Sequence, residues 1–135
     1  MTRRLPRVSK QDGQPLESTI QAQVVHALRR LGWVVWEMQK GSRGNGAVYC
    51  TPGIPDLYVF NATRALWLEL KRPGTGRLSP AQKERHHELT VCGLPVFTVT
   101  SLDEARAALT APNPAPETTH DVLTALSAKY AGRKA

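Results

Sequence analysis

Two acidic side chains and one lysine stand among apolar residues in the stretch GIPDLYVFNATRALWLELK, which covers residues 53–71. They are Asp56, Glu69 and Lys71. Two neighbouring carboxylates repel each other, and a hard divalent cation removes that repulsion, because Mg²⁺ prefers oxygen ligands and needs only one or two carboxylates. An amine beside such a site can orient a water, or help to deprotonate it, for attack on a phosphodiester. These residue types have the parts needed for metal-assisted phosphodiester hydrolysis.

The spacing of these residues predicts that they meet. Alternate side chains of a strand share a face, so Glu69 and Lys71 lie on one face of the strand predicted over residues 65–71. Asp56 begins the strand predicted over residues 56–60, and the short NATR turn makes the two strands antiparallel neighbours. We therefore expect Asp56 and the Glu-Leu-Lys end of its partner strand at the same edge of a sheet.

A purely structural role remains open at this point. Lys71 could neutralise Glu69 at an ion-paired edge, and Asp56 could cap a turn after Pro55. Each of these short patterns is common by itself. Their combination favours catalysis: a Gly-x-Pro-Asp turn, an apolar strand, a short turn, and a second apolar strand that ends in Glu-Leu-Lys.

The elements that must position this site follow from hydrophobic periodicity and capping residues. The sequence predicts helices over residues 15–31, 80–92 and 101–109, and strands over residues 33–38, 56–60, 65–71 and 95–99. Pro15 is expected at the first position of the first helix, and the WVVWEM strand is expected to be buried. Two helical crossovers indicate an α/β fold with a mixed sheet of about four strands flanked by helices.

Composition divides the chain into three parts. Residues 1–14 form a basic, flexible segment, residues 15–110 a single domain, and residues 111–135 a proline-rich linker with a short helix. The formal charge of +7 over 135 residues suits a polyanion, either nucleic acid or an anionic membrane surface. The sequence has no apolar stretch near the ~20 residues of a membrane span, no secretory signal and no disulfide framework, so the expected location is the cytoplasm.

The sequence resembles the PD-(D/E)xK nuclease superfamily and, within it, the virus-type replication-repair nuclease (VRR-NUC) domain. The resemblance covers roughly residues 16 to 110, and the segments that carry it are Gly53–Leu57, Trp67–Lys71, Gly76 and Leu78–Gln82. It implies a restriction-endonuclease-like core and a Mg²⁺- or Mn²⁺-dependent DNA nuclease. Asp56, Glu69 and the backbone carbonyl of Leu70 are the implied metal ligands, and Lys71 is the implied catalytic lysine.

The resemblance has implications for biology as well. Stand-alone members of the family are typically homodimers, and some act on branched DNA such as four-way (Holliday) junctions in replication, repair or recombination. A bacterial or phage-infected cell is the implied setting. These are expectations about this chain, with DNA as the partner and a membrane excluded.

Two further residues carry alternatives. Glu17 could cap the first helix and favour its dipole, or it could face the metal and help to hold it. Gln82 could complete a capping box with Ser79, or it could reach the active site as a catalytic residue.

The cations near the proposed site are expected to contact DNA phosphates without reading sequence. They are Lys40, Arg43, Arg72, Arg77, Lys83 and Arg85. His86 and His87 are adjacent and point about 100° apart on a helix, so we expect them to be solvated or to face DNA.

Two other function classes compete with the nuclease. One is a non-catalytic nucleic-acid-binding module that keeps a nuclease fold, which predicts salt-dependent binding without turnover. The other is a basic ribosome- or membrane-associated protein, which predicts no divalent-metal site. The intact set of Asp56, Glu69 and Lys71 favours the enzyme, because a binding module has no need of all three.

Overall fold

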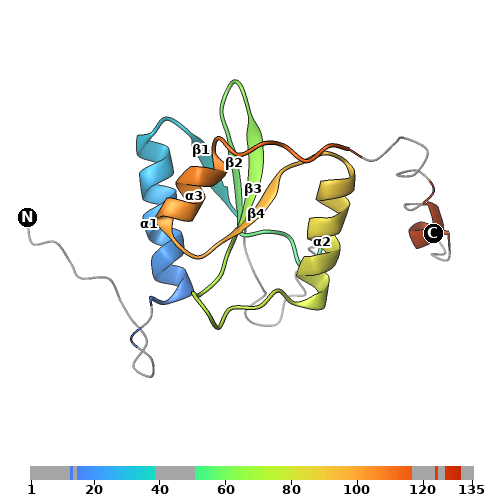
Figure 1. Ribbon diagram of the computed structural model, residues 1–135, viewed down its shortest axis with the longest axis horizontal. Coiled ribbons are helices and arrows are strands. Elements are labelled where there is room, and N and C mark those ends of the chain that lie inside the picture. The colour runs from blue at the N-terminus through green and yellow to red at the C-terminus, as the bar shows by residue number, and fades with distance from the viewer. Residues whose placement is uncertain (1–12, 14, 39–50, 117–123, 125–126, 132–135) are drawn as a thin grey trace, which may run out of the picture.

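The computed structural model describes residues 13, 15–38, 51–116, 124 and 127–131, and Figure 1 shows their arrangement. In chain order the elements are α1 (Glu17–Arg30), β1 (Val34–Glu37), β2 (Leu57–Phe60), β3 (Ala65–Leu70), α2 (Pro80–Val91), β4 (Val96–Val99) and α3 (Leu102–Ala108). Each helix and strand predicted within residues 15–109 is present, with ends that shift by at most two residues. Of the helices in these described segments, none is long and apolar enough to cross a membrane.

The four strands form one mixed sheet, as predicted, and their order is β1-β2-β3-β4. The β1/β2 and β2/β3 pairs are antiparallel, and β3/β4 is parallel. In the β2/β3 hairpin Leu57 pairs with Leu68. The Asn61 side chain stabilises the turn, because its Oδ1 accepts hydrogen bonds from the backbone N–H groups of Thr63 and Arg64 at 2.9 and 3.0 Å. A fixed turn fixes the hairpin register, on which the position of the site depends.

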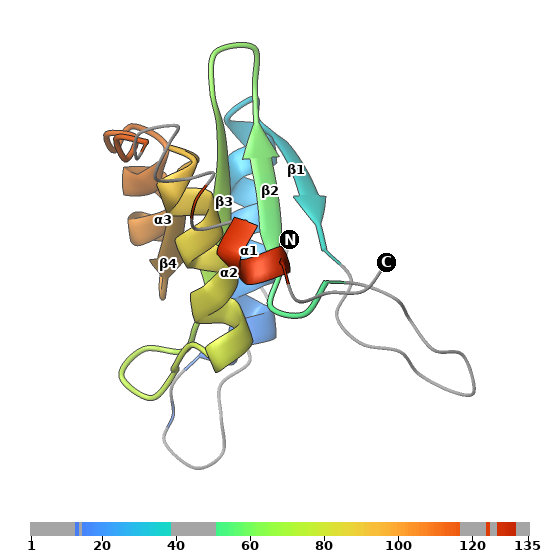
Figure 2. The ribbon, with the colours of Figure 1, turned by 90° about the vertical axis from the view of Figure 1, so that its right-hand side faces the viewer.

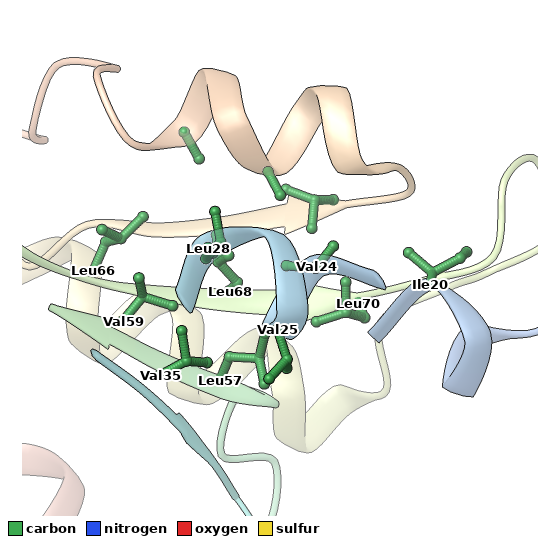
Figure 3. Packing of buried hydrophobic residues seen from close by; sticks show 13 residues of the cluster. Ile20, Val24, Val25, Leu28, Val35, Leu57, Val59, Leu66, Leu68 and Leu70 are labelled. Carbon is green, nitrogen blue, oxygen red and sulfur yellow. The ribbon is translucent and has the colours of Figure 1, made fainter. Parts of the chain in front are cut away.

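Helices cover both faces of the sheet. Helices α1 and α3 lie against one face and α2 lies against the other (Figures 1 and 2). The core lies under α1, where apolar side chains of the helix meet alternate side chains of the strands (Figure 3). Leu66, Leu68 and Leu70 are fully buried there. The opposite face of β3 is therefore the one that carries Trp67 and Glu69.

The first helix begins later than predicted. Leu16 is the N-cap residue, with an extended backbone (φ −69°, ψ 146°), and the helix starts at Glu17. Pro15 therefore precedes the helix, and its expected place at the first helical position is wrong. The Pro15 carbonyl accepts a hydrogen bond from Arg72 Nε at 3.4 Å, which ties the start of α1 to the residues after β3.

The expected burial of the first strand is also wrong. β1 is an edge strand, and within it only Val35 is buried. Trp36 is 56 % exposed and Val34 is 44 % exposed. Among the described helices, α1 packs on the other face of β1, so these β-forming side chains have no helix above them (Figure 2).

The described part of the C-terminal segment contacts α2. Lys129 forms ion pairs with Glu84 and Glu88, each at 2.7 Å, and the Tyr130 hydroxyl donates to Glu88 Oε2 at 3.2 Å. The division at residues 14 and 110 stays a prediction.

Candidate active site

Asp56 and Glu69 lie side by side, as the hairpin spacing predicts. Continuing the β2/β3 register by one residue places them opposite each other. The backbone N–H of Asp56 donates to Glu69 Oε2 at 3.2 Å, and the backbone N–H of Leu70 donates to Asp56 Oδ2 at 2.6 Å. Asp56 is 2 % exposed and Glu69 is fully buried. Each acid is thus held by the main chain near the other, and we call these two residues the acidic pair.

The acidic pair has the donor chemistry that a hard divalent cation needs, because both side chains offer carboxylate oxygens. In an extended strand the N–H and C=O of one residue face the same neighbour, so the Leu70 carbonyl is directed to the side on which Asp56 lies. Within the described segments no group of three or more His, Cys, Asp or Glu side chains gathers as a metal site. Asp56, Glu69 and the Leu70 carbonyl are the groups that would hold such an ion.

Lys71 lies directly after β3 and keeps the extended geometry. Its backbone N–H donates to the Val99 carbonyl of β4 at 3.0 Å, so strand alternation continues through it. The Lys71 side chain therefore starts from the same face as Glu69. It is partly exposed, whereas the acidic pair is buried.

Two glycines let the chain close tightly around the site. Gly53 has φ +81°, and a Cβ atom there would lie 2.3 Å from the carbonyl carbon of Ala81, in the first turn of α2. A Cβ atom at Gly76 would lie 2.8 Å from the Cβ atom of Lys71. The loop before Asp56 thus packs directly on the main chain of α2, and the loop after β3 folds back against Lys71.

Gln82 forms the capping box. Its Oε1 accepts from the backbone N–H of Ser79 at 2.8 Å, and its own backbone N–H donates to Ser79 Oγ at 3.2 Å. Capping uses only Oε1, so the side-chain NH₂ still has donors to offer. The two roles weighed for Gln82 are therefore compatible, and a catalytic role remains a prediction.

Glu17 is the first residue of α1, where its charge favours the helix dipole. In the described segments it does not join the acidic pair in a three-carboxylate cluster. The hydrogen bond from Arg72 to Pro15 brings the start of α1 to the same end of β3 as Lys71. A role for Glu17 toward the metal remains a prediction.

The predicted phosphate-contacting cations differ in their surroundings. Arg77 and Lys83 are exposed, and Arg77 donates to the carbonyls of its own loop. Arg85 is partly buried and ion-paired with Glu84 at 2.9 Å and with Glu88. Much of the Arg85 charge is therefore balanced within α2. Lys40 and Arg43 lie outside the described residues.

His86 is a neighbour of the acidic pair. It lies one turn after Gln82 on α2 and is partly buried, and its Nε2 is buried without a hydrogen-bond partner among the described residues. Burial lowers the pKa of His86 below its ordinary value of 6.5, and the charge of Lys71 lowers it further, while Asp56 acts in the opposite direction. His86 is therefore partly buried rather than solvated, and the alternative that it faces DNA stays a prediction, whereas His87 is exposed as expected.

The lowered pKa of His86 predicts a pH-dependent stability. Below the ordinary pKa the unfolded chain binds a proton that the folded chain resists, so the free energy of unfolding falls as pH drops through this window. We expect the wild-type melting midpoint in EDTA to fall between about pH 7.5 and pH 5.5 by more than that of His86→Gln. His87→Gln is the matched control, and a slope that equals the wild-type slope in both variants would contradict the assignment to His86.

Comparison with known proteins supports the fold. The chain forms a mixed four-stranded sheet flanked by helices, which is an α/β arrangement. A solved structure described as "VRR_NUC domain" is similar to this chain, with a TM-score of 0.55, 22 % identity, and coverage of 69 % of this chain and 92 % of that one. The predicted resemblance is thereby confirmed at the level of the fold. No family model and no curated protein matches the chain.

Proposed function

We propose that this chain is a divalent-metal-dependent nuclease that hydrolyses DNA phosphodiester bonds. The observation that carries the proposal is the buried acidic pair, held by reciprocal main-chain hydrogen bonds next to Lys71. Two carboxylates at one end of a sheet offer the oxygen ligands that a hard divalent cation needs. The VRR_NUC fold of the chain gives that function a context.

In the proposed mechanism, Asp56, Glu69 and the Leu70 carbonyl hold Mg²⁺ or Mn²⁺, with Glu17 as a further contributor. The bound ion would offset charge that develops on the phosphate and make water easier to deprotonate. Lys71 orients the attacking water and stabilises negative charge on the phosphate oxygens. Gln82 uses its NH₂ group to donate to a phosphate oxygen or to the water, while its Oε1 keeps the helix cap.

The chain's positive charge supports a DNA substrate. The formal charge of +7 favours association with a polyanion, and Arg72, Arg77 and Lys83 would contact phosphates on both sides of the cleaved bond, with Arg85, Lys40 and Arg43 as further contacts. The resemblance extends the proposal to branched DNA such as four-way junctions, in repair or recombination. The resemblance also extends the proposal to a homodimer, whose two sites would make paired cuts.

The test is cleavage of a labelled four-way junction and a linear duplex of matched sequence, each with Mg²⁺, Mn²⁺ or EDTA. We expect cleavage with either metal and none in EDTA. Glu69→Gln keeps the shape of the side chain and removes a charge, and we expect it to lose at least about 100-fold in rate. Metal-dependent turnover that persists at the wild-type rate in Glu69→Gln would mean that the acidic pair is not the site.

The same samples separate the rival functions. Salt-sensitive DNA binding without turnover in either metal would favour the non-catalytic binding module. A melting midpoint that does not respond to Mn²⁺ would exclude a metal site, because an ion that binds only the folded chain must stabilise it.

A further inference from the structure

A cluster of aromatic side chains covers the sheet face that carries the acidic pair. Trp36, Tyr58, Phe60 and Trp67 contact one another, with ring centroids 4.6 to 5.8 Å apart. The sequence has three Trp, three Tyr and two Phe, so half of its aromatic residues lie in this cluster. We call these four residues the aromatic platform.

The aromatic platform is open toward β1. Helix α2 lies over the part of this face that β3 and β4 form, and α1 and α3 lie against the opposite face (Figures 1 and 2). Trp36 is consequently 56 % exposed, and Tyr58, Phe60 and Trp67 are partly exposed. Trp36 is thus the most exposed ring of the platform, and an exposed aromatic ring beside partly exposed ones is a candidate binding surface.

The aromatic platform continues directly from the acidic pair. Trp67 and Glu69 are alternate residues of β3 on the same face, so they lie roughly 7 Å apart along the strand. A nucleotide whose phosphate is held at the acidic pair can therefore place its base over the Trp67 ring. The rings of Tyr58 and then Trp36 lie beyond it, toward the edge of the sheet.

A pocket at Trp67 has room for one planar ring system. Its volume is about 240 Å³, and its apolar walls come from Trp67, Ile54, Pro55 and Leu89. Its polar edge comes from Thr51, Arg85 and Glu88. Sites for drug-sized ligands are larger, at about 300 to 1,000 Å³, so this pocket suits a group of the size of a nucleobase.

We propose that the aromatic platform binds unpaired nucleobases, so that the preferred substrate has single-stranded nucleotides next to the cleaved bond. The inference rests on the proposed function for the identity of the polymer. Unpaired bases fit because aromatic side chains stack on the face of any base, while a paired base exposes only its edges. The net charge of +7 gives the attraction to the polymer, and the aromatic platform adds selection for strands whose bases are free.

The experiment measures binding without cleavage. In EDTA, fluorescence anisotropy compares a labelled oligothymidylate of about 12 nucleotides with an abasic strand of the same length and charge. We expect the wild type to bind the base-bearing strand at least about tenfold more tightly. Trp36→Ala should weaken that binding by about 5- to 30-fold and leave abasic binding unchanged. Val34→Ala, on the same exposed strand, is the matched control and should bind like the wild type.

Three results would overturn the inference. The first is equal affinity of the wild type for the two strands. The second is unchanged oligothymidylate binding by a folded Trp36→Ala variant. The third is a light-scattering result in which the wild type is a dimer and Trp36→Ala is a monomer. The last result would assign the aromatic platform to a second copy of the chain. Binding is measured in EDTA, and cleavage is measured separately with Mg²⁺. Base-selective binding in EDTA without nuclease activity in Mg²⁺ would count against the proposed function alone, and cleavage in Mg²⁺ without base-selective binding would count against this inference alone.

Discussion

Lys71→Ala is expected to lower the rate of DNA cleavage by about 100- to 10,000-fold, the usual range for loss of a group that acts on protons or developing charge. Lys71 follows Leu70, whose backbone N–H is bonded to Asp56, and its side chain starts from the face that carries Glu69. An alanine side chain cannot orient water or approach a phosphate. The substitution leaves both carboxylates in place, so Mn²⁺ should still raise the melting midpoint of the variant.

Single-turnover cleavage and thermal melts with Mn²⁺ measure these two effects separately. Lys83→Ala is the control, since it removes an exposed cation from the neighbouring helix α2. It should weaken DNA binding and reduce its salt dependence without a comparable loss of rate at saturating DNA. Equal cleavage by the wild type and Lys71→Ala would show that the catalytic residue has been misidentified, whatever the metal result.

Gly53→Ala is expected to cost about 3 kcal/mol of folding stability and to disrupt the site. The residue has φ +81°, which costs an alanine about 1–2 kcal/mol. The added Cβ atom would also lie 2.3 Å from the carbonyl carbon of Ala81, so one of two main-chain segments must move, at a further cost of about 1–3 kcal/mol. Because Asp56 lies three residues after Gly53, that movement also displaces one member of the acidic pair.

Urea unfolding with and without Mn²⁺ tests this expectation. Gly74→Ala is the matched control, because Gly74 has φ +73° and open space where a Cβ atom would be. It should show only the backbone cost of about 1–2 kcal/mol and retain the response to Mn²⁺. If Gly53→Ala and Gly74→Ala lose the same stability, the close approach of the loop to α2 has no energetic importance.

The sequence predicts the hairpin and its acidic pair well because both depend on local rules. Strand alternation separates buried Leu68 from Glu69, and a four-residue turn that Asn61 stabilises brings Asp56 opposite Glu69. Burial of β1 could not be predicted in this way. Whether Trp36 is covered depends on which helix crosses above it, and no pattern within WVVWEM carries that information.

The sequence also could not predict the parts of the site that come from packing between distant segments. Gly53 carries a motif in the sequence, but its physical reason is contact with Ala81, which lies 28 residues further on. His86 approaches the acidic pair only because α2 crosses this face of the sheet. Because His86 lies four residues after Gln82, both residues lie on one side of α2. This spacing is a signal in the sequence that could have indicated His86 as a second α2 residue directed at the site.

The reciprocal hydrogen bonds between the strands that carry Asp56 and Glu69 also bear on how the chain reaches its native state. A hairpin shifted by one residue would no longer set the two acids opposite each other, and it would lose both main-chain contacts that aim them. A cation held between these acids, as proposed, would bind only correctly paired chains and would draw the refolding population toward them. The ion would then favour the correct strand pairing during folding, in addition to its proposed part in DNA cleavage.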